Sequence, residues 1–113
     1  MKLQDLERHY NVLSEIHDRF RTGERQMERG ADEDEKVIAE REMATALLLS
    51  DNYIGMNEEL YNMLTGGESD AISDYSRESQ YEEFKSRQYF GRDMSNFLDE
   101  LKSRIREKKG TDY

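Results

Sequence analysis

The chain has 113 residues, of which 38% are charged and only 35% hydrophobic, and its net charge is −9 at pH 7. This length allows a single domain, and so few apolar residues can build a narrow core but not a thick one. The excess of acids argues against binding to a nucleic-acid backbone, which needs clustered Lys and Arg, and the absence of cysteine excludes disulfides and thiolate chemistry.

The fold expected from this composition is all-α. No proline interrupts the chain, and its apolar residues recur at the three- or four-residue spacing of one helix face. We expect an elongated helical hairpin or a small antiparallel helical bundle, whose helices share a narrow apolar seam.

Residues 2–50 form the first predicted helical segment. Its part of the apolar seam consists of Leu3, Leu6, Tyr10, Leu13 and Phe20. Gly23 and Gly30 each cost about 1 kcal/mol in a helix interior relative to alanine, and the acids at 32–35 suit the start of a helix. The sequence therefore leaves open whether 2–50 is one helix or two helices with a break near residue 30.

The most apolar stretch, residues 43–64, contains a polar break. Ser50-Asp51-Asn52 are residue types that favour turns and N-caps, so the first helical segment is expected to stop there. A second helix is predicted over 53–64, before the glycine pair that follows it. Residues 65–79 are polar and rich in Ser and Asp, which predicts a loop or a weakly ordered helical extension.

The last predicted helix covers residues 80–109. It opens with a capping box at Ser79-Gln80-Tyr81-Glu82 and closes with Lys108-Lys109-Gly110, a cationic end followed by a glycine stop. Its part of the apolar seam consists of Phe84, Phe90, Met94, Phe97 and Leu101. We predict that this helix packs antiparallel to 2–50, with 53–64 leading into the second arm.

The sequence contains no pattern that would support catalysis. His9 and His17 lie eight positions apart, outside the HExxH and ExxH arrangements of metal sites. The acids at 32–35 lack the glycine and the spacing of a calcium loop. The apolar run at 46–49 is far too short to span a bilayer. We therefore expect no enzyme activity, no cofactor, no small-molecule ligand and no membrane insertion.

Two short patterns stand out in the second half of the chain. Tyr53-Ile54-Gly55 lies between two predicted helices, and Tyr89-Phe90-Gly91-Arg92-Asp93 has the form Y-x-x-x-D. This arrangement resembles the small helical-hairpin (WXG-like) proteins of type VII secretion, in which an aromatic-x-Gly turn joins two antiparallel helices and a Y-x-x-x-D/E export motif follows. The chain is similar in particular to the helical adaptors that accompany LXG-type toxins.

The resemblance implies a non-enzymatic adaptor or targeting factor for type VII secretion. Tyr53 and Gly55 would form the turn, Tyr89 and Asp93 would form the export motif, and the apolar seam would dock on helices of the toxin. The N-terminal ten residues lack the apolar region of a signal peptide. We therefore expect a cytoplasmic protein, and any export would proceed without a cleaved signal peptide.

The residues leave two other functions open. One is an acidic, phage-encoded inhibitor that mimics nucleic acid, which predicts that the carboxylates of 28–42 and 68–83 form one stripe facing a basic partner. The other is a homo-oligomeric helical scaffold, which predicts self-association without a partner. A charge-driven complex weakens steeply with salt and an apolar one does not, which separates the first alternative from the adaptor.

Overall fold

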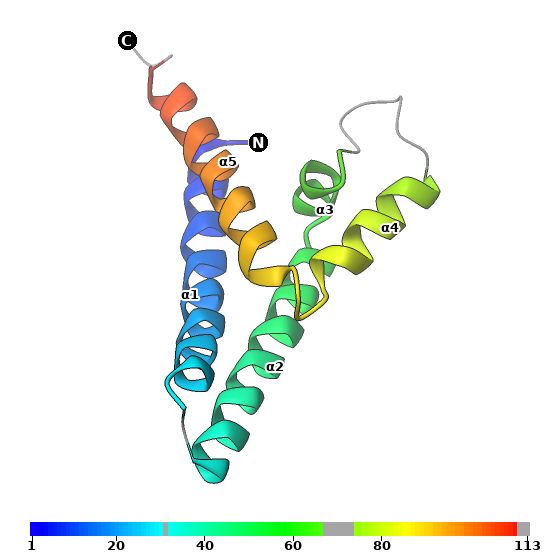
Figure 1. Ribbon diagram of the computed structural model, residues 1–113. Coiled ribbons are helices and arrows are strands. Elements are labelled where there is room, and N and C mark those ends of the chain that lie inside the picture. Colours follow the sequence, from blue (N-terminus) through cyan, green and yellow to red (C-terminus); the bar gives the residue numbers. More distant parts are fainter. Residues whose placement is uncertain (31, 67–73, 111–113) are drawn as a thin grey trace.

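The computed structural model describes residues 1–30, 32–66 and 74–110, and within these ranges all regular structure is α-helical (Figure 1). This confirms the expected all-α fold. In chain order the helices are α1 (Leu3–Glu28), α2 (Glu33–Gly55), α3 (Glu58–Leu64), α4 (Asp74–Phe84) and α5 (Phe90–Gly110).

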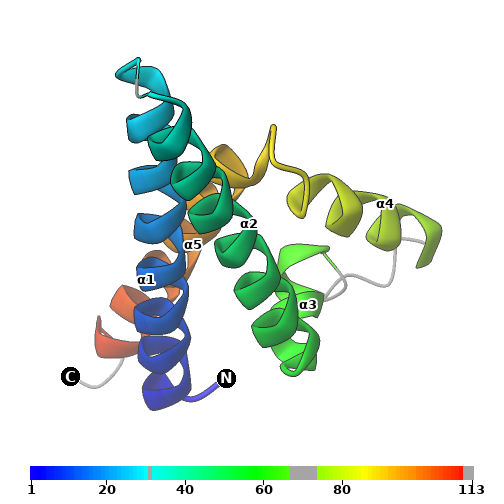
Figure 2. The ribbon, with the colours of Figure 1, turned by 90° about the horizontal axis from the view of Figure 1, so that it is seen from below.

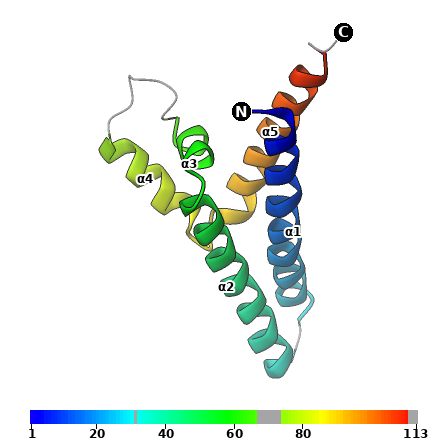
Figure 3. The same ribbon diagram turned by 180° about the vertical axis from the view of Figure 1, so that it is seen from behind.

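The centre of the fold is an antiparallel hairpin of α1 and α2, with α5 packed on α1. Figures 1 and 3 show α5 running back along α1, so that the end of α5 lies near the start of α1. Seen from below, in Figure 2, α3 and α4 lie beside the end of α2, away from the α1–α5 pair. The predicted pairing of 2–50 with 80–109 is therefore only partly right, because the hairpin forms within 2–50 itself.

The chain reverses direction between α1 and α2, near residue 30. Gly30 has a φ of +69°, in the left-handed region that favours glycine. On the far side of the turn, the Asp32 carboxylate accepts a hydrogen bond of 2.9 Å from the Glu35 backbone N–H and so caps α2. Of the two alternatives left open by the sequence, the one with two helices is correct.

The predicted helix stop at Ser50-Asp51-Asn52 is wrong, because α2 continues through it to Gly55. The helix contains these polar residues because two of them face the rest of the protein. Ser50 is buried, and the Asp51 carboxylate accepts a hydrogen bond of 2.5 Å from the Tyr81 hydroxyl of α4. A short break follows before α3, where the Asn57 side chain donates to the Tyr53 carbonyl over 2.6 Å.

Two predictions for the C-terminal half are also wrong. α4 begins within the predicted loop 65–79, at Asp74, so the capping-box Ser79 lies inside a helix rather than at its start. The predicted continuous helix 80–109 is divided into α4 and α5 by a turn at residues 85–89. Residues 67–73 of the predicted loop lie outside the described ranges.

The turn at 85–89 follows from the phase of the apolar residues. Phe84 and Phe97 are 13 positions apart, which is about 220° around a straight helix, so one straight helix would point them in nearly opposite directions. The turn brings both rings into the same core, where the Phe84 ring centroid lies 6.5 Å from that of Phe97 and 5.5 Å from that of Phe90. The Ser86 hydroxyl supports the turn by donating to the Glu83 carbonyl over 2.7 Å.

α4 is attached to the rest of the protein mainly through polar side chains. Tyr81 bonds Asp51 of α2, and its ring packs edge-on against Tyr61 of α3 with centroids 5.0 Å apart. Burial and the nearby Asp51 carboxylate raise the pKa of the Tyr81 phenol above its ordinary value. Arg77 donates to the Asn62 side chain of α3. Of the described α4 side chains, only Phe84 is fully buried.

α1 and α2 lie close together at Gly23. A Cβ atom placed there would lie 2.7 Å from Met43 Cγ and 2.9 Å from the Ala39 carbonyl oxygen, distances that packed atoms do not adopt. The glycine therefore offsets its poor helix propensity by letting the two helices cross closely.

We expect Gly23→Ala to lower the free energy of unfolding by about 1–3 kcal/mol, because overpacking at a close crossing outweighs the better helix propensity of alanine. Urea unfolding followed by circular dichroism measures the change. Gly55→Ala is the matched control: Gly55 likewise has helical backbone, in α2, but nothing lies within 4 Å of an added Cβ. That variant should be as stable as the parent chain or more stable by up to about 1 kcal/mol. An equal gain from both substitutions would contradict the close crossing.

Candidate functional site

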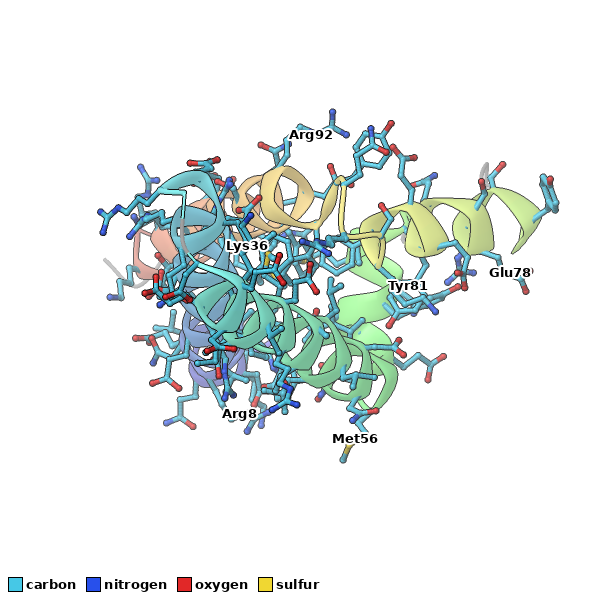
Figure 4. All side chains as sticks on the ribbon, turned by 60° about the horizontal axis from the view of Figure 1, so that its bottom comes forward. Arg8, Lys36, Met56, Glu78, Tyr81 and Arg92 are labelled. Carbon is cyan, nitrogen blue, oxygen red and sulfur yellow. The ribbon has the colours of Figure 1, made fainter. Side chains whose placement is uncertain are left out.

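The helix α2 carries apolar side chains on two opposite sides. One side is buried against the rest of the protein and includes Ala39, Met43, Ala46 and Ile54. The other side is exposed, and we call it the outer face of α2: Val37 (48% exposed), Ile38 (55%), Leu48 (64%), Leu49 (41%) and Met56 (84%), the residue that follows the helix. Figure 4 shows the Met56 side chain pointing away from the helices.

The outer face is an interrupted strip of apolar side chains along one side of the helix. At 100° per residue its five apolar members fall within an arc of about 120°. Arg41, Thr45 and Asn52 lie within the same arc, between the apolar residues. The strip can therefore make apolar contact with another helix at its two ends and its middle, with polar groups between them.

Exposed apolar side chains are concentrated here. In the described residues, the large hydrophobic side chains that are exposed are Met1, Tyr75 and the five of the outer face. Scattered apolar residues on a surface are normal, whereas a contiguous group on one helix marks an interaction site. The outer face of α2 is thus the candidate functional site.

The apolar seam predicted to contact a partner is used inside the protein instead. Leu3 and Tyr10 are partly buried, and the other eight seam residues are buried, in the core shared by α1, α2, α4 and α5: Leu6, Leu13, Phe20, Phe84, Phe90, Met94, Phe97 and Leu101. In α1 and α5 the two halves of the seam meet each other. A partner that docks on the folded chain therefore contacts other residues.

The predicted aromatic-x-Gly turn is not a turn. Tyr53 and Gly55 both lie in α2, and no atom lies within 4 Å of a Cβ placed on Gly55, so neither space nor a positive φ requires glycine there. The Tyr53 hydroxyl instead bonds the Nδ1 atom of His9 over 2.7 Å and joins α2 to α1. The aromatic residue acts as a helix-to-helix contact rather than as part of a connection.

Tyr89 and Asp93 of the candidate export motif lie side by side at the start of α5. The Asp93 N–H donates to the Tyr89 carbonyl over 2.9 Å. Arg92 links them: its guanidinium lies over the Tyr89 ring, 4.9 Å from the centroid, and its Nε donates to the Asp93 carboxylate over 3.1 Å. Both side chains are partly buried. Their role in export stays a prediction.

His9 is a polar residue that is buried in the structure, which the sequence did not indicate. It is only 1% exposed. Burial and the charge of Arg8 lower the pKa of its imidazole, and the carboxylates of Asp5 and Glu59 oppose this in part. Its Nε2 atom and the hydroxyl of Ser50, also buried, have no hydrogen-bond partner among the described residues.

Surface clefts lie between the helices of the described residues. A cleft of about 320 Å³ lies among α3, α4 and α5, with Phe84 and Phe97 inside and Glu83, Asp93 and Glu100 around it. In the described ranges, no three His, Cys, Asp or Glu side chains are grouped so that they could hold a metal ion. None of the helices described combines the length and the apolar character that a membrane span requires.

Comparison with known proteins adds no relationship. No protein-family model matches the sequence, and no curated protein or solved structure was found to match it.

Acidification is expected to destabilise the protein through His9. Because burial lowers the folded-state pKa of this imidazole below its ordinary value of 6.5, the unfolded chain takes up a proton at a higher pH than the folded chain does. The stabilisation that follows from this difference in pKa is complete above the pKa of His9 in the unfolded chain. It is lost as the pH falls below that value, by at most about 1.4 kcal/mol per pH unit for one proton. Urea unfolding at about pH 7.5 and about pH 5.5 measures the loss.

The substitution His9→Phe should remove this part of the pH dependence. His17→Gln is the matched control, because His17 lies on the same helix but is only partly buried and contacts the Gly91 carbonyl at 3.2 Å. If His9→Phe kept the whole pH dependence, the buried imidazole would not be its source.

Proposed function

We propose that the chain is a non-enzymatic helical adaptor, which binds a helix of a partner protein on the outer face of α2. The resemblance of the sequence to adaptors of LXG-type toxins suggests the helical region of such a toxin as the partner, in type VII secretion. The observation that carries the proposal is the second apolar side of α2, which no other part of the described chain covers.

The surface is suited to a helix. α2 already packs against α1 on its inner side, and a partner helix on its outer side would make α2 the middle member of a three-helix layer. Such packing is held by side chains at three- and four-residue spacing that interdigitate. Burying the five apolar side chains would add stabilisation of roughly 25 cal/mol for each Å² removed from water.

The docking surface is present before the partner arrives. The buried core is made by α1, α2 and α5 with contributions from α3 and α4, and it does not include the outer face. The proposal is therefore docking on a folded chain rather than folding that depends on a partner. This differs from the sequence-based expectation that the seam itself would be completed by toxin helices.

The acidic-inhibitor alternative is not favoured by a particular observation. It expects the carboxylates of 28–42 and 68–83 to form one stripe. Within the described residues these carboxylates belong to the end of α1 and the first half of α2 on one side, and to α4 on the other, which Figures 1 and 3 show in separate parts of the molecule. The scaffold alternative, self-association, is an outcome of the test below.

A photo-crosslinking residue placed at Leu48 tests the proposal in the native host. We expect one discrete adduct, with the crosslink mapped by mass spectrometry to a helical segment of another protein. Tyr75 is the control position, because it is 81% exposed and lies on α4, away from the outer face. Adducts only between copies of this chain would support the scaffold, and equal adducts from both positions, or none, would contradict the adaptor.

With the captured partner purified, Leu48→Asp should weaken binding by at least about tenfold, because a buried contact is replaced by a carboxylate. The thermal stability of the variant alone should stay within about 0.5 kcal/mol of the parent, since Leu48 is 64% exposed.

A further inference from the structure

The charges around the outer face of α2 indicate what kind of helix it fits. α2 carries six carboxylates and two cations. By helical position, Glu33, Glu40 and Asp51 lie along one edge of the outer face, and Glu35 and Glu42 lie along the other. Asp34 lies within the arc of the outer face, one turn before Val37. The face is thus an apolar strip with acids on both sides.

Most of these acids are not neutralised by the protein itself. Glu42 is paired with Arg19 of α1 at 2.6 Å, which lowers the pKa of Glu42. Asp51 accepts a hydrogen bond from Tyr81 and forms an ion pair with Lys85 at 4.0 Å. In the described ranges, no ion pair joins Glu33, Glu35 or Glu40 to a cation of this chain. Both edges therefore keep negative charge that a partner can meet.

The two cations of α2 leave most of the negative charge along these edges in place. Lys36 lies about 200° around the helix from Met56, on the other side of α2, and Figure 4 shows the two labelled side chains on opposite sides. Arg41 is exposed within the outer face. It is the one cation of α2 that a docked helix would meet.

We infer that the outer face of α2 binds a basic amphipathic helix, with apolar residues at three- and four-residue spacing and Lys or Arg on both flanks. This inference rests on the proposed function. The distance from Val37 to Met56, 19 residues apart, is about 28 Å along a helix, so the complementary segment has about 20 residues. The apolar strip supplies the buried contact, and the charges set the choice of partner and the rate of association.

A second copy of this chain is a poor occupant. Two α2 helices packed through their outer faces would bring the carboxylate edges of one copy against those of the other, and each chain has a net charge of −9. Like charges across an interface suppress pairing. An anionic membrane surface is disfavoured for the same reason, because helices that lie on membranes carry Lys and Arg beside their apolar side.

The test uses the full chain and two synthetic helical peptides of about 20 residues with identical Leu positions. One peptide has Lys on both flanks and the other has Glu. Fluorescence anisotropy is measured at about 50 mM and about 500 mM NaCl. We expect the Lys peptide to bind at least about tenfold more tightly than the Glu peptide at low salt, with the difference shrinking at high salt.

Substitutions connect the binding to the face. The double substitution Glu33→Gln and Glu40→Gln should weaken binding of the Lys peptide several-fold, and Arg41→Gln should strengthen that binding. The matched control is the pair Glu15→Gln and Glu78→Gln, two exposed acids on α1 and α4, which should change nothing. Leu48→Gln should abolish most of the binding of the Lys peptide.

The outcomes separate this inference from the proposed function. Equal binding of the Lys and Glu peptides, both lost in Leu48→Gln, would overturn the basic partner but support helix docking. Lys-peptide binding that survives Leu48→Gln, or that the control pair weakens as much as the edge pair, would be diffuse attraction to an acidic protein and would overturn the inference. Binding of neither peptide, or dimerisation through Leu48 in sedimentation, would overturn it as well.

Discussion

The packing of α1 against α2 is the contact on which the other elements depend. The two helices cross where Gly23 leaves no Cβ between them, close to the Ala39 carbonyl and the Met43 side chain. At the far end of the hairpin, His9 and Tyr53 join the same two helices through a hydrogen bond of 2.7 Å. Because α5 packs on α1 and α3 follows directly from α2, the positions of α3 and α5 depend on this pair.

The helical character of the chain was predictable from residues alone, since the three- and four-residue spacing in 2–20 and 90–105 holds in the structure as buried faces of α1 and α5. The reversal near residue 30 was visible as an alternative, because Gly30 and the acids after it are ordinary signals for the end of one helix and the start of the next. These features depend on local physics.

The predictions that were wrong concern helix ends and helix faces that are set by tertiary contacts. Ser50, Asp51 and Asn52 resemble a helix stop, but burial of Ser50 and the bond from Tyr81 to Asp51 keep them within α2. The helix over 80–109 looked continuous because it contains no proline and its cap signals stand at its two ends, whereas the angular offset between Phe84 and Phe97 marked the turn. The outer face of α2 could not be recognised, since the sequence around Leu47-Leu48-Leu49 shows apolar residues on all sides and only packing decides which side is covered.

α4 is held to the rest of the protein by fewer buried side chains than α1. Its attachments include the Tyr81 and Arg77 side chains, an ion pair of 3.8 Å from Glu83 to Arg92 and the one buried ring of Phe84, whereas α1 contributes five buried side chains and one buried glycine to the interior. A region held by few buried contacts opens locally at a lower free-energy cost than a region held by many. We therefore expect α4 to open more readily than the hairpin of α1 and α2, so that its backbone amides exchange with solvent and its peptide bonds meet a protease while the outer face of α2 keeps its shape.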